Sequence, residues 1–218
     1  MGAPAAFTTR LLSPETWEAF SKLVETNGGI WGGCWCIAYH LDPLGPKGQC
    51  KPYRETKERL VREGRAQAAL VFEGDEAAGW CQFGRPIELP NLKNRKNYEQ
   101  GLDRLPDWRI TCFYVGKAFR KRGVANVALD GALAEIARSG GGVVEAYPEE
   151  VLGRKTSSSF LHMGTMPMFE RRGFERVRQI GMHQWVVKKL VERARGPVVE
   201  MMGFEPTTSA VRLQRSPS

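Results

Sequence analysis

The chain has 218 residues, of which 42% are hydrophobic and 26% are charged, so it is long enough to bury a full core and its composition excludes wholesale disorder. Its formal net charge of +8 favours anionic partners but does not choose among nucleotides, nucleic acids and membrane surfaces. The sequence has no apolar run of about 18 residues and no secretory signal, and its 5 cysteines are an odd number. These features argue against a membrane span and a disulfide framework, and they predict a cytoplasmic protein.

The first half of the chain alternates between patterns typical of strands and of helices. Ser13 followed by Pro14 is a typical helix start, and Asn27 with Gly28 is a typical helix end. The expected elements are a strand at residues 7–12, the helix that Ser13 starts, a charged helix at residues 51–63, and a hairpin of strands at residues 67–72 and 76–83.

A cysteine-rich segment lies between the two expected helices. Cys34, Cys36, His40 and Cys50 could form a set of metal ligands. However, the Cys-x-Cys spacing is shorter than that of zinc sites, and no second paired motif follows, so we expect no metal. The segment is interpreted either as a buried patch of thiols and aromatic rings or as the lining of a substrate pocket.

A polar stretch at residues 84–107 separates the hairpin from the next strand. It is rich in asparagine and basic residues, and we expect an irregular loop. Loops of this length in compact domains are commonly functional or disordered. The stretch is therefore either a cover over a binding site or a solvated insertion.

The centre of the chain predicts a strand, a basic loop and a long helix in direct succession. Residues 108–115 are rich in β-branched and aromatic side chains, and apolar residues recur at helical spacing from Val124 to Arg138. The loop between them contains Arg120, Lys121, Arg122 and Gly123. A glycine at a helix start lets backbone N–H groups approach a ligand, and the helix dipole favours an anion there. This stretch predicts a phosphate site.

The last third of the chain predicts three more strands and a short helix. The strands are expected at residues 143–147, 174–180 and 183–191, and the helix at residues 167–172 after a loop at residues 149–166. Residues 192–218 have little apolar periodicity, so we expect a disordered tail. Residues 1–191 then form a single domain.

Two of these segments resemble motifs of the GNAT N-acetyltransferase superfamily. Arg120-x-x-Gly123-x-Ala125 resembles its acyl-CoA signature, with a strand before it and a helix after it. Residues 168–174 resemble its later helix-to-strand motif. The resemblance covers residues 7–190 and is typical of a bacterial-type member. It implies an α/β (α+β type) fold with a mixed, mostly antiparallel twisted sheet that is flanked by helices and splays beside the central strand.

The resemblance also implies the ligand and the reaction. An acetyl group passes from acetyl-CoA to a primary amine, a small molecule or a peptide, by direct attack in a ternary complex, with no metal. The loop amides would bind the pyrophosphate, and the strand would pair its backbone with the pantetheine amides. The residues that we expect to bind CoA are Phe113, Tyr114, Val115, Arg120, Lys121, Arg122, Gly123, Val124 and Ala125.

The sequence departs from the superfamily at the expected proton donor. Many members have a tyrosine where this chain has Phe169, which has no proton to give. Glu145 is our candidate base and Tyr147 our candidate acid, because alternate residues of a strand project to one face. Both could instead be packing residues. His162 and His183 could titrate near neutrality, although a lone exposed histidine is commonly incidental.

Two other classes of function compete with catalysis. Phe169 makes a non-catalytic CoA-binding sensor or interaction module the main alternative. A nucleic-acid binder would use the basic residues 51–65 and 93–96, but no nucleic-acid module is recognisable, so we expect no nucleic-acid partner. A homodimer is left open.

Overall fold

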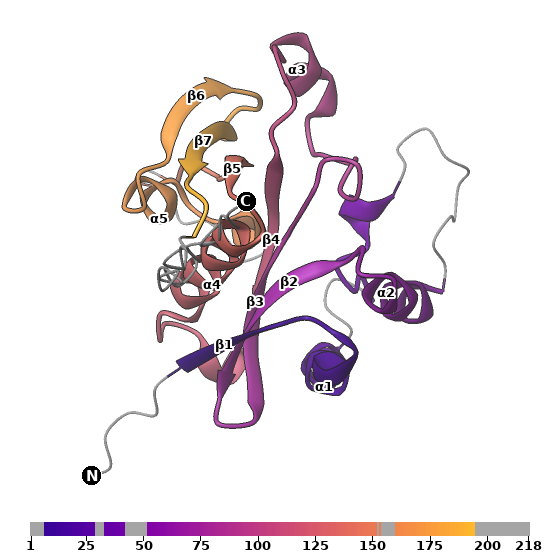
Figure 1. Cartoon of the computed structure of the whole chain (residues 1–218). Coiled ribbons are helices and arrows are strands. Elements are labelled where there is room, and N and C mark those ends of the chain that lie inside the picture. Colours follow the sequence, from indigo (N-terminus) through magenta and orange to yellow (C-terminus); the bar gives the residue numbers. More distant parts are fainter. Residues whose placement is uncertain (1–6, 29–32, 42–51, 152, 154–159, 195–218) are drawn as a thin grey trace, which may run out of the picture.

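The computed structural model describes residues 7–28, 33–41, 52–151, 153 and 160–194 (Figure 1). Seven strands form one sheet in the order β1-β2-β3-β4-β5-β7-β6. Every neighbouring pair is antiparallel except β4 and β5, which are parallel. The predicted α/β class, with a mixed and mostly antiparallel sheet flanked by helices, is confirmed.

Most elements lie where the residue patterns predict them. The strands are β1 (Phe7–Leu11), β2 (Gln67–Glu73), β3 (Glu76–Gly84), β4 (Trp108–Val115), β5 (Gly142–Ala146), β6 (Glu175–Gln179) and β7 (Trp185–Val191). The α-helices are α1 (Trp17–Thr26), α2 (Tyr53–Arg62), α3 (Arg95–Gln100), α4 (Val124–Arg138) and α5 (Met166–Glu170). Four 3-10 turns, η1 (Pro14–Thr16), η2 (Ala38–His40), η3 (Lys117–Phe119) and η4 (Phe160–Met163), complete the described elements.

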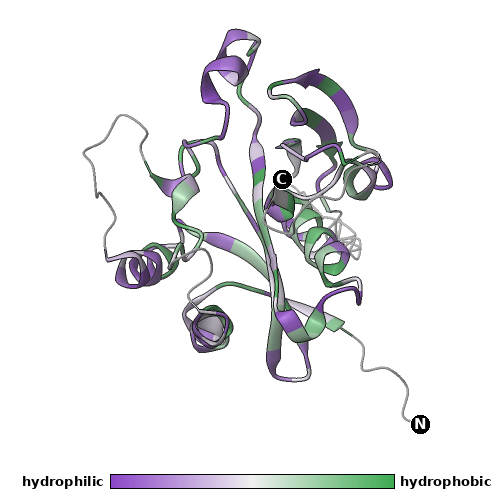
Figure 2. Ribbon diagram, turned by 180° about the vertical axis from the view of Figure 1, so that it is seen from behind, coloured by the Kyte–Doolittle hydropathy of each residue, from purple (hydrophilic) through white to green (hydrophobic). Residues whose placement is uncertain are grey.

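Two apolar clusters hold the helices against the two faces of the sheet. One contains α1, α2 and the segment after α1, and its largest rings belong to Trp17, Trp35 and Trp80. The other contains α4 and α5 and includes Phe113 and Phe169. Figure 2 shows the consequence: α4 and the central strands carry many hydrophobic residues, whereas α2 and α3 are mostly hydrophilic.

The expectation of an irregular loop at residues 84–107 is wrong in one part, because helix α3 forms there. The helix has little apolar periodicity, and tertiary contacts hold it, among them hydrogen bonds from Arg178 to the Asn97 and Tyr98 carbonyls. Tyr98 is only 2% exposed, and its hydroxyl donates a hydrogen bond of 2.7 Å to Glu145 Oε2 on β5. Such a long-range contact leaves no local pattern in the sequence.

The expected tail begins where the described residues nearly end. Strand β7 ends at Val191, and residues 195–218 lie outside the described part of the chain, so the tail stays a prediction. Within the described residues, no helix is both long and apolar enough to cross a membrane.

Candidate functional site

Strand β4 is paired from Arg109 to Val115 with β3 on one side and along only three positions with β5 on the other. On the β5 side the register covers three positions, from Trp108 opposite Val144 to Ile110 opposite Ala146. Strand β5 ends there, while β4 continues to Val115. Among the described strands, none pairs with residues 111–115 on this side. The sheet therefore splays at β4, as the resemblance implied.

A β-bulge lies at the point where the two strands part. Gln82 on β3 pairs with Cys112, but the next residue, Phe83, pairs with Ile110, so Thr111 is an extra residue on β4. A bulge bends the strand and increases its local twist. The bulge explains why β4 turns away from β5 directly after Ile110.

The open edge of β4 has backbone groups available to a ligand. The Gly116 N–H donates to the Ala78 carbonyl on the β3 side at 2.9 Å. Because backbone groups alternate between the two edges of a strand, we expect the N–H groups of Phe113 and Val115 to face the open side. The Arg120 Nε, which lies 3.4 Å from the Val115 carbonyl oxygen, agrees with this orientation.

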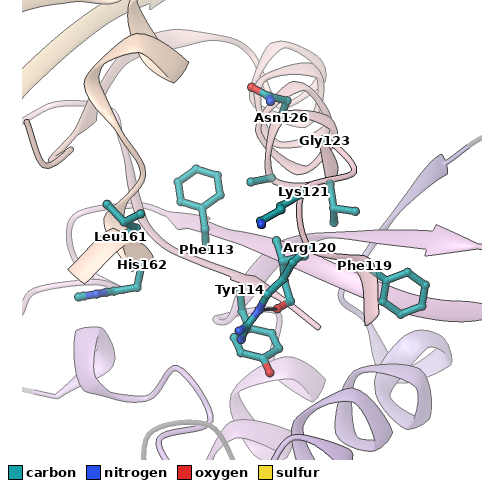
Figure 3. Close-up of a pocket in the computed structure, with 12 residues that line it drawn as sticks. Phe113, Tyr114, Phe119, Arg120, Lys121, Gly123, Asn126, Leu161 and His162 are labelled. Carbon is teal, nitrogen blue, oxygen red and sulfur yellow. Dashed lines mark hydrogen bonds between the residues drawn. The ribbon is translucent and has the colours of Figure 1, made fainter. Parts of the chain in front are cut away.

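A cavity of about 340 Å³ lies at this open edge. Figure 3 shows Phe113 at its centre, Leu161 and His162 of η4 on one side, and Lys121 and Arg120 on the other. The cavity, called here the loop cavity, is lined by Phe113, Tyr114, Val115, Phe119, Arg120, Lys121, Gly123, Val124, Ala125, Asn126, Leu161 and His162. Eight of the nine residues predicted to bind CoA are in this set.

The start of α4 gives the loop cavity its anion-binding character. Gly123 is the N-cap residue with a φ of 84°, a left-handed conformation that favours glycine. The first N–H groups of a helix have no carbonyl partner within the helix, and the dipole adds positive potential at this end. Lys121, which also has a positive φ of 62°, and Arg120 line the same cavity.

Arg122 is the one predicted CoA-binding residue that does not line this cavity. Its Nη1 donates to Glu73 Oε2 at 3.0 Å, and a second hydrogen bond joins Nη2 to Oε1 of the same carboxylate. This contact lowers the pKa of Glu73, chiefly through the hydrogen bond. Arg122 thus ties the loop to the end of β2, and its role in CoA binding stays a prediction.

A second cavity, of about 360 Å³, adjoins the first at His162, which lines both. It is called here the thiol cavity, because three cysteines contribute to its wall. Its lining residues are Cys34, Cys36, Ala38, Tyr39, Asn91, Leu92, Lys93, Cys112 and His162. The cysteine-rich segment is buried among aromatic rings and also lines this cavity, and its part in a substrate pocket stays a prediction. The described part of the chain contains no group of three or more His, Cys, Asp or Glu side chains that could hold a metal ion.

His162 lies between the two cavities with an aromatic neighbour. Its Nε2 is 3.1 Å from the Tyr39 hydroxyl, and η4 packs beside β4. Burial raises the pKa of Tyr39 well above its ordinary value, so this phenol stays protonated near neutral pH. In the tautomer with its proton on Nε2, the imidazole donates a hydrogen bond to the Tyr39 hydroxyl oxygen, keeps a defined orientation and carries its basic lone pair on Nδ1.

Glu145 and Tyr147 lie together, as predicted, but at the paired half of β4. The Tyr147 hydroxyl donates to Glu145 Oε2 at 3.1 Å, and the Lys188 ammonium lies 3.2 Å from Oε1. Glu145 is 1% exposed and Tyr147 is fully buried, and burial raises the pKa of Tyr147 well above its ordinary value. Neither residue lines the loop cavity or the thiol cavity. Their catalytic assignment stays a prediction.

The later motif, residues 168–174, supports the start of α4. Phe169 is fully buried, with its ring 6.0 Å from that of Phe113 and 5.1 Å from that of Phe174. Arg172 donates to both carboxylate oxygens of Asp130 and to the side chain of Asn126 on α4. The motif thus fixes the helix whose N-terminus faces the loop cavity.

Phe119, Asn126 and Leu161 line the loop cavity without having been predicted. The sequence marks His162 only as a histidine that could titrate, and its position between the cavities depends on η4 lying beside β4. Because this contact crosses about fifty residues of chain, no local periodicity signals it. Asn126 was within reach of prediction, as it lies in the first turn of a helix expected to bind an anion.

No protein-family model matches this chain, and the search of curated proteins finds no match. Similar solved structures include one described as an acetyltransferase of the GNAT family from Desulfovibrio desulfuricans, at 15% identity and a TM-score of 0.49, covering 85% of this chain and 99% of that one. The ribosomal-protein-S18-alanine N-acetyltransferase of Escherichia coli is similar at 9% identity and a TM-score of 0.46, covering 88% and 99%.

A third similar structure is RimL, the ribosomal L7/L12 alpha-N-protein acetyltransferase, in complex with coenzyme A, at 14% identity and a TM-score of 0.43, covering 88% of this chain and 98% of that one. At these identities and TM-scores, we transfer no residue role from any of the three to this chain.

Proposed function

We propose that this chain is an acetyl-CoA-dependent N-acetyltransferase of the GNAT type. The observation that carries the proposal is the combination at β4: an open strand edge at residues 111–115 runs directly into a helix N-terminus capped by Gly123. An elongated ligand with amides at one end and phosphates at the other matches both features. The pantetheine and pyrophosphate of CoA are such a ligand.

The open edge also suits the reacting thioester. Pantetheine amides can pair with the Phe113 and Val115 backbone as an additional strand would. A remaining β4 N–H would then donate to the thioester carbonyl and stabilise the oxyanion that forms when an amine attacks. Holding both substrates in this geometry supplies much of the rate enhancement, and no covalent acyl-enzyme is required.

The thiol cavity is the proposed acceptor site. Its position next to the loop cavity would bring a bound amine to the thioester through the shared boundary at His162. Leu92, Ala38 and the cysteines give it mostly apolar walls, so we propose a primary amine with a compact apolar body, free or at the end of a peptide.

His162 is the proposed base that removes a proton from the amine. It lines both cavities, and Tyr39 orients its ring. Glu145 and Tyr147 remain the alternative pair, although a proton would have to reach them through the buried part of β4. Phe169 is excluded as the acid because a phenyl ring has no exchangeable proton.

The proposal is tested by measuring CoA binding and CoA release with the same preparation. Calorimetry with acetyl-CoA should detect a single site, and free CoA should appear when a panel of apolar primary amines and peptides with free N-termini is added. Binding of acetyl-CoA without turnover on any amine would favour the sensor, which Phe169 makes the second candidate. Absence of binding would contradict both.

A further inference from the structure

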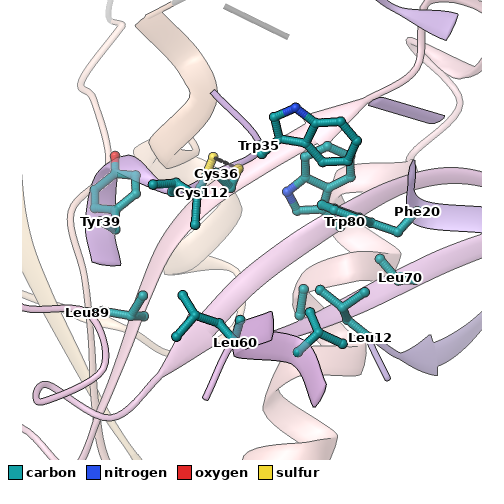
Figure 4. Close-up of a cluster of buried hydrophobic side chains, with 14 of the residues drawn as sticks. Leu12, Phe20, Trp35, Cys36, Tyr39, Leu60, Leu70, Trp80, Leu89 and Cys112 are labelled. Atoms are coloured by element: carbon teal, nitrogen blue, oxygen red, sulfur yellow. Dashed lines mark hydrogen bonds between the residues drawn. The ribbon is translucent and has the colours of Figure 1, made fainter. Parts of the chain in front are cut away.

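Two cysteine thiols meet at the inner wall of the thiol cavity. The Sγ atoms of Cys36 and Cys112 lie 3.0 Å apart, and both are free thiols. Cys36 comes from the segment after α1 and Cys112 from the bulge of β4, so the pair joins two elements far apart in the chain. A disulfide requires a separation of about 2.0 Å, so a shift of about 1 Å would close the bond. Figure 4 shows the two sulfur atoms side by side between Tyr39 and the rings of Trp35 and Trp80.

A buried ammonium group lies behind the pair. Lys57 is 1% exposed, and its Nζ donates to Gln82 Oε1 at 2.9 Å and lies 3.4 Å from His40 Nε2. No ion pair joins it to a carboxylate within the described residues. Burial lowers the pKa of Lys57 to about 8, and the nearby cysteines oppose this shift. The groups whose negative charge would stabilise this ammonium are the thiols of Cys36, Cys112 and Cys34.

Cys36 is the thiol that these surroundings favour as a thiolate. The hydrogen bond with Cys112 lowers the pKa of Cys36 most, and Lys57 acts in the same direction against the effect of burial. The pKa of Cys112 is raised, so Cys112 is the partner that keeps its proton. The Trp80 Nε1 is buried without a hydrogen-bond acceptor among the described residues, and a thiolate at Cys36 would supply one.

The pair is also within reach of a small reagent. Cys36 and Cys112 are 4% and 6% exposed, and both line the thiol cavity. Cys81, in contrast, is fully buried in the other apolar cluster, and burial raises its pKa well above the ordinary value. A reactive cysteine needs both thiolate character and access to the reagent. Among the cysteines that the structure describes, Cys36 meets both conditions and has a second thiol, Cys112, in contact.

We propose that Cys36 and Cys112 form a dithiol site that hydrogen peroxide oxidises to an intramolecular disulfide. The Cys36 thiolate attacks one peroxide oxygen, the O–O bond breaks, and hydroxide leaves to become water after it takes the proton released by Cys36. Cys112 then attacks the sulfenic sulfur, the S–O bond breaks, and the departing hydroxide takes the Cys112 proton. Two electrons pass from the thiols to one peroxide, which becomes two waters.

The test uses the unmodified full-length protein under native conditions. After treatment with one equivalent of hydrogen peroxide, free thiols are alkylated and the protein is digested with trypsin. Cleavage after lysine and arginine places Cys112 in the peptide of residues 110–117 and Cys36 in that of residues 23–47. We expect these two peptides to be linked, with a loss of two thiols for each chain, and the link to disappear on treatment with a reductant.

Matched cysteine variants assign the bond. Cys34→Ser should retain the link, which excludes Cys34 as the partner within the shared peptide, and Cys81→Ser should retain it as well. Cys36→Ala and Cys112→Ala should each lose it. Full alkylation of both thiols after peroxide, a link to Cys34 or to the peptide of Cys50, or a link that forms only in denaturant would overturn the proposal.

Lys57→Met tests the origin of the reactivity with a side chain of similar length and no charge. We expect the disulfide to form about tenfold more slowly. Without the ammonium, the pKa of Cys36 should rise by about one unit, which lowers its thiolate population about tenfold. Lys22→Met, at an exposed position on α1, is the control and should react at the original rate. Equal rates in all three proteins would overturn the part assigned to Lys57.

Discussion

The two halves of β4 have the same kind of sequence and different surroundings. In the paired half, Arg109 and Glu145 are opposite each other across β4 and β5, and Glu145 is opposite Lys188 across β5 and β7. This row places a carboxylate between two cations, with Tyr98 as an additional donor. In the open half, backbone groups and two cavities replace the neighbouring strand.

The comparison shows that the end of β5, together with the bulge at Thr111, decides where β4 has an open edge. Beside the paired half, buried polar groups satisfy one another, and such networks rigidify a core. Beside the open half, the strand edge has no strand partner among the described residues. We therefore expect changes at the paired half to alter stability and changes at the open half to alter binding or turnover.

Glu145→Ala should give the largest effect in the paired half. It removes a carboxylate that is 1% exposed and leaves Lys188 and the Tyr98 hydroxyl without their partner. Lys188 is only partly buried, so the cost comes chiefly from the Tyr98 and Tyr147 hydroxyls, at about 1–3 kcal/mol each in the free energy of unfolding, which urea denaturation measures. Glu99→Ala, which breaks an exposed pair with Arg95, is the control and should cost about 0–1 kcal/mol.

The same variant distinguishes the structural role of Glu145 from a catalytic one. A protein that keeps its stability and its affinity for acetyl-CoA but loses turnover would restore Glu145 as the base. In that case, the expectation that changes at the paired half of β4 alter stability rather than turnover would be wrong.

His162→Gln should give the next largest effect, in the open half. Glutamine keeps a hydrogen-bonding group near Tyr39 but cannot act as a base at neutral pH. Loss of a general base lowers turnover by about a hundredfold to ten-thousandfold, while the affinity for acetyl-CoA should change little. His183→Gln, whose side chain lines neither cavity, is the matched control and should retain full turnover. An unchanged rate in His162→Gln would return the proton transfer to Glu145 and Tyr147.

Lys121→Glu and Arg122→Glu compare two neighbouring cations of the loop with the same change of charge. Lys121 lines the loop cavity, whereas Arg122 is bound to Glu73. We expect Lys121→Glu to weaken acetyl-CoA binding by about thirtyfold, or about 2 kcal/mol, and Arg122→Glu to weaken it by less than about threefold. Calorimetry at constant salt measures both. Equal losses would mean that only the net charge of the loop matters.

The sequence predicts most of the fold and most of the residues that line the loop cavity, but not the place of His162 between the two cavities. Strand β4, the loop and α4 were predictable with correct bounds because their patterns are local: β-branched residues, a glycine and a helical apolar stripe. The orientation of Arg122, the anchoring of α3 by Tyr98 and the position of His162 depend on contacts between distant segments. Glu145 and Tyr147 were correctly expected to share a face, but a strand pattern does not show where its neighbour ends.

Lys57→Met should give the smallest effect, a change in how the free energy of unfolding depends on pH. Its basis is the difference in surroundings between Lys188 and Lys57. Lys188 faces the Glu145 carboxylate, whereas Lys57 lies under the open half with Gln82 and His40, which are neutral. Burial lowers the pKa of Lys57 in the folded protein to about 8, below its ordinary value, so between these two values the unfolded chain binds more protons. The free energy of unfolding should therefore rise with pH in this window.

From about pH 7 to about pH 9, the contribution of Lys57 to this rise should be about 1 kcal/mol, and Lys57→Met should lack it. Lys22→Met, on the exposed side of α1, leaves Lys57 and its neighbours in place and should keep the full rise. Urea denaturation under reducing conditions at the two pH values measures the difference. An identical rise in all three proteins would mean that Lys57 keeps its proton throughout, and the thiols beside it would then have to supply the negative charge that stabilises it.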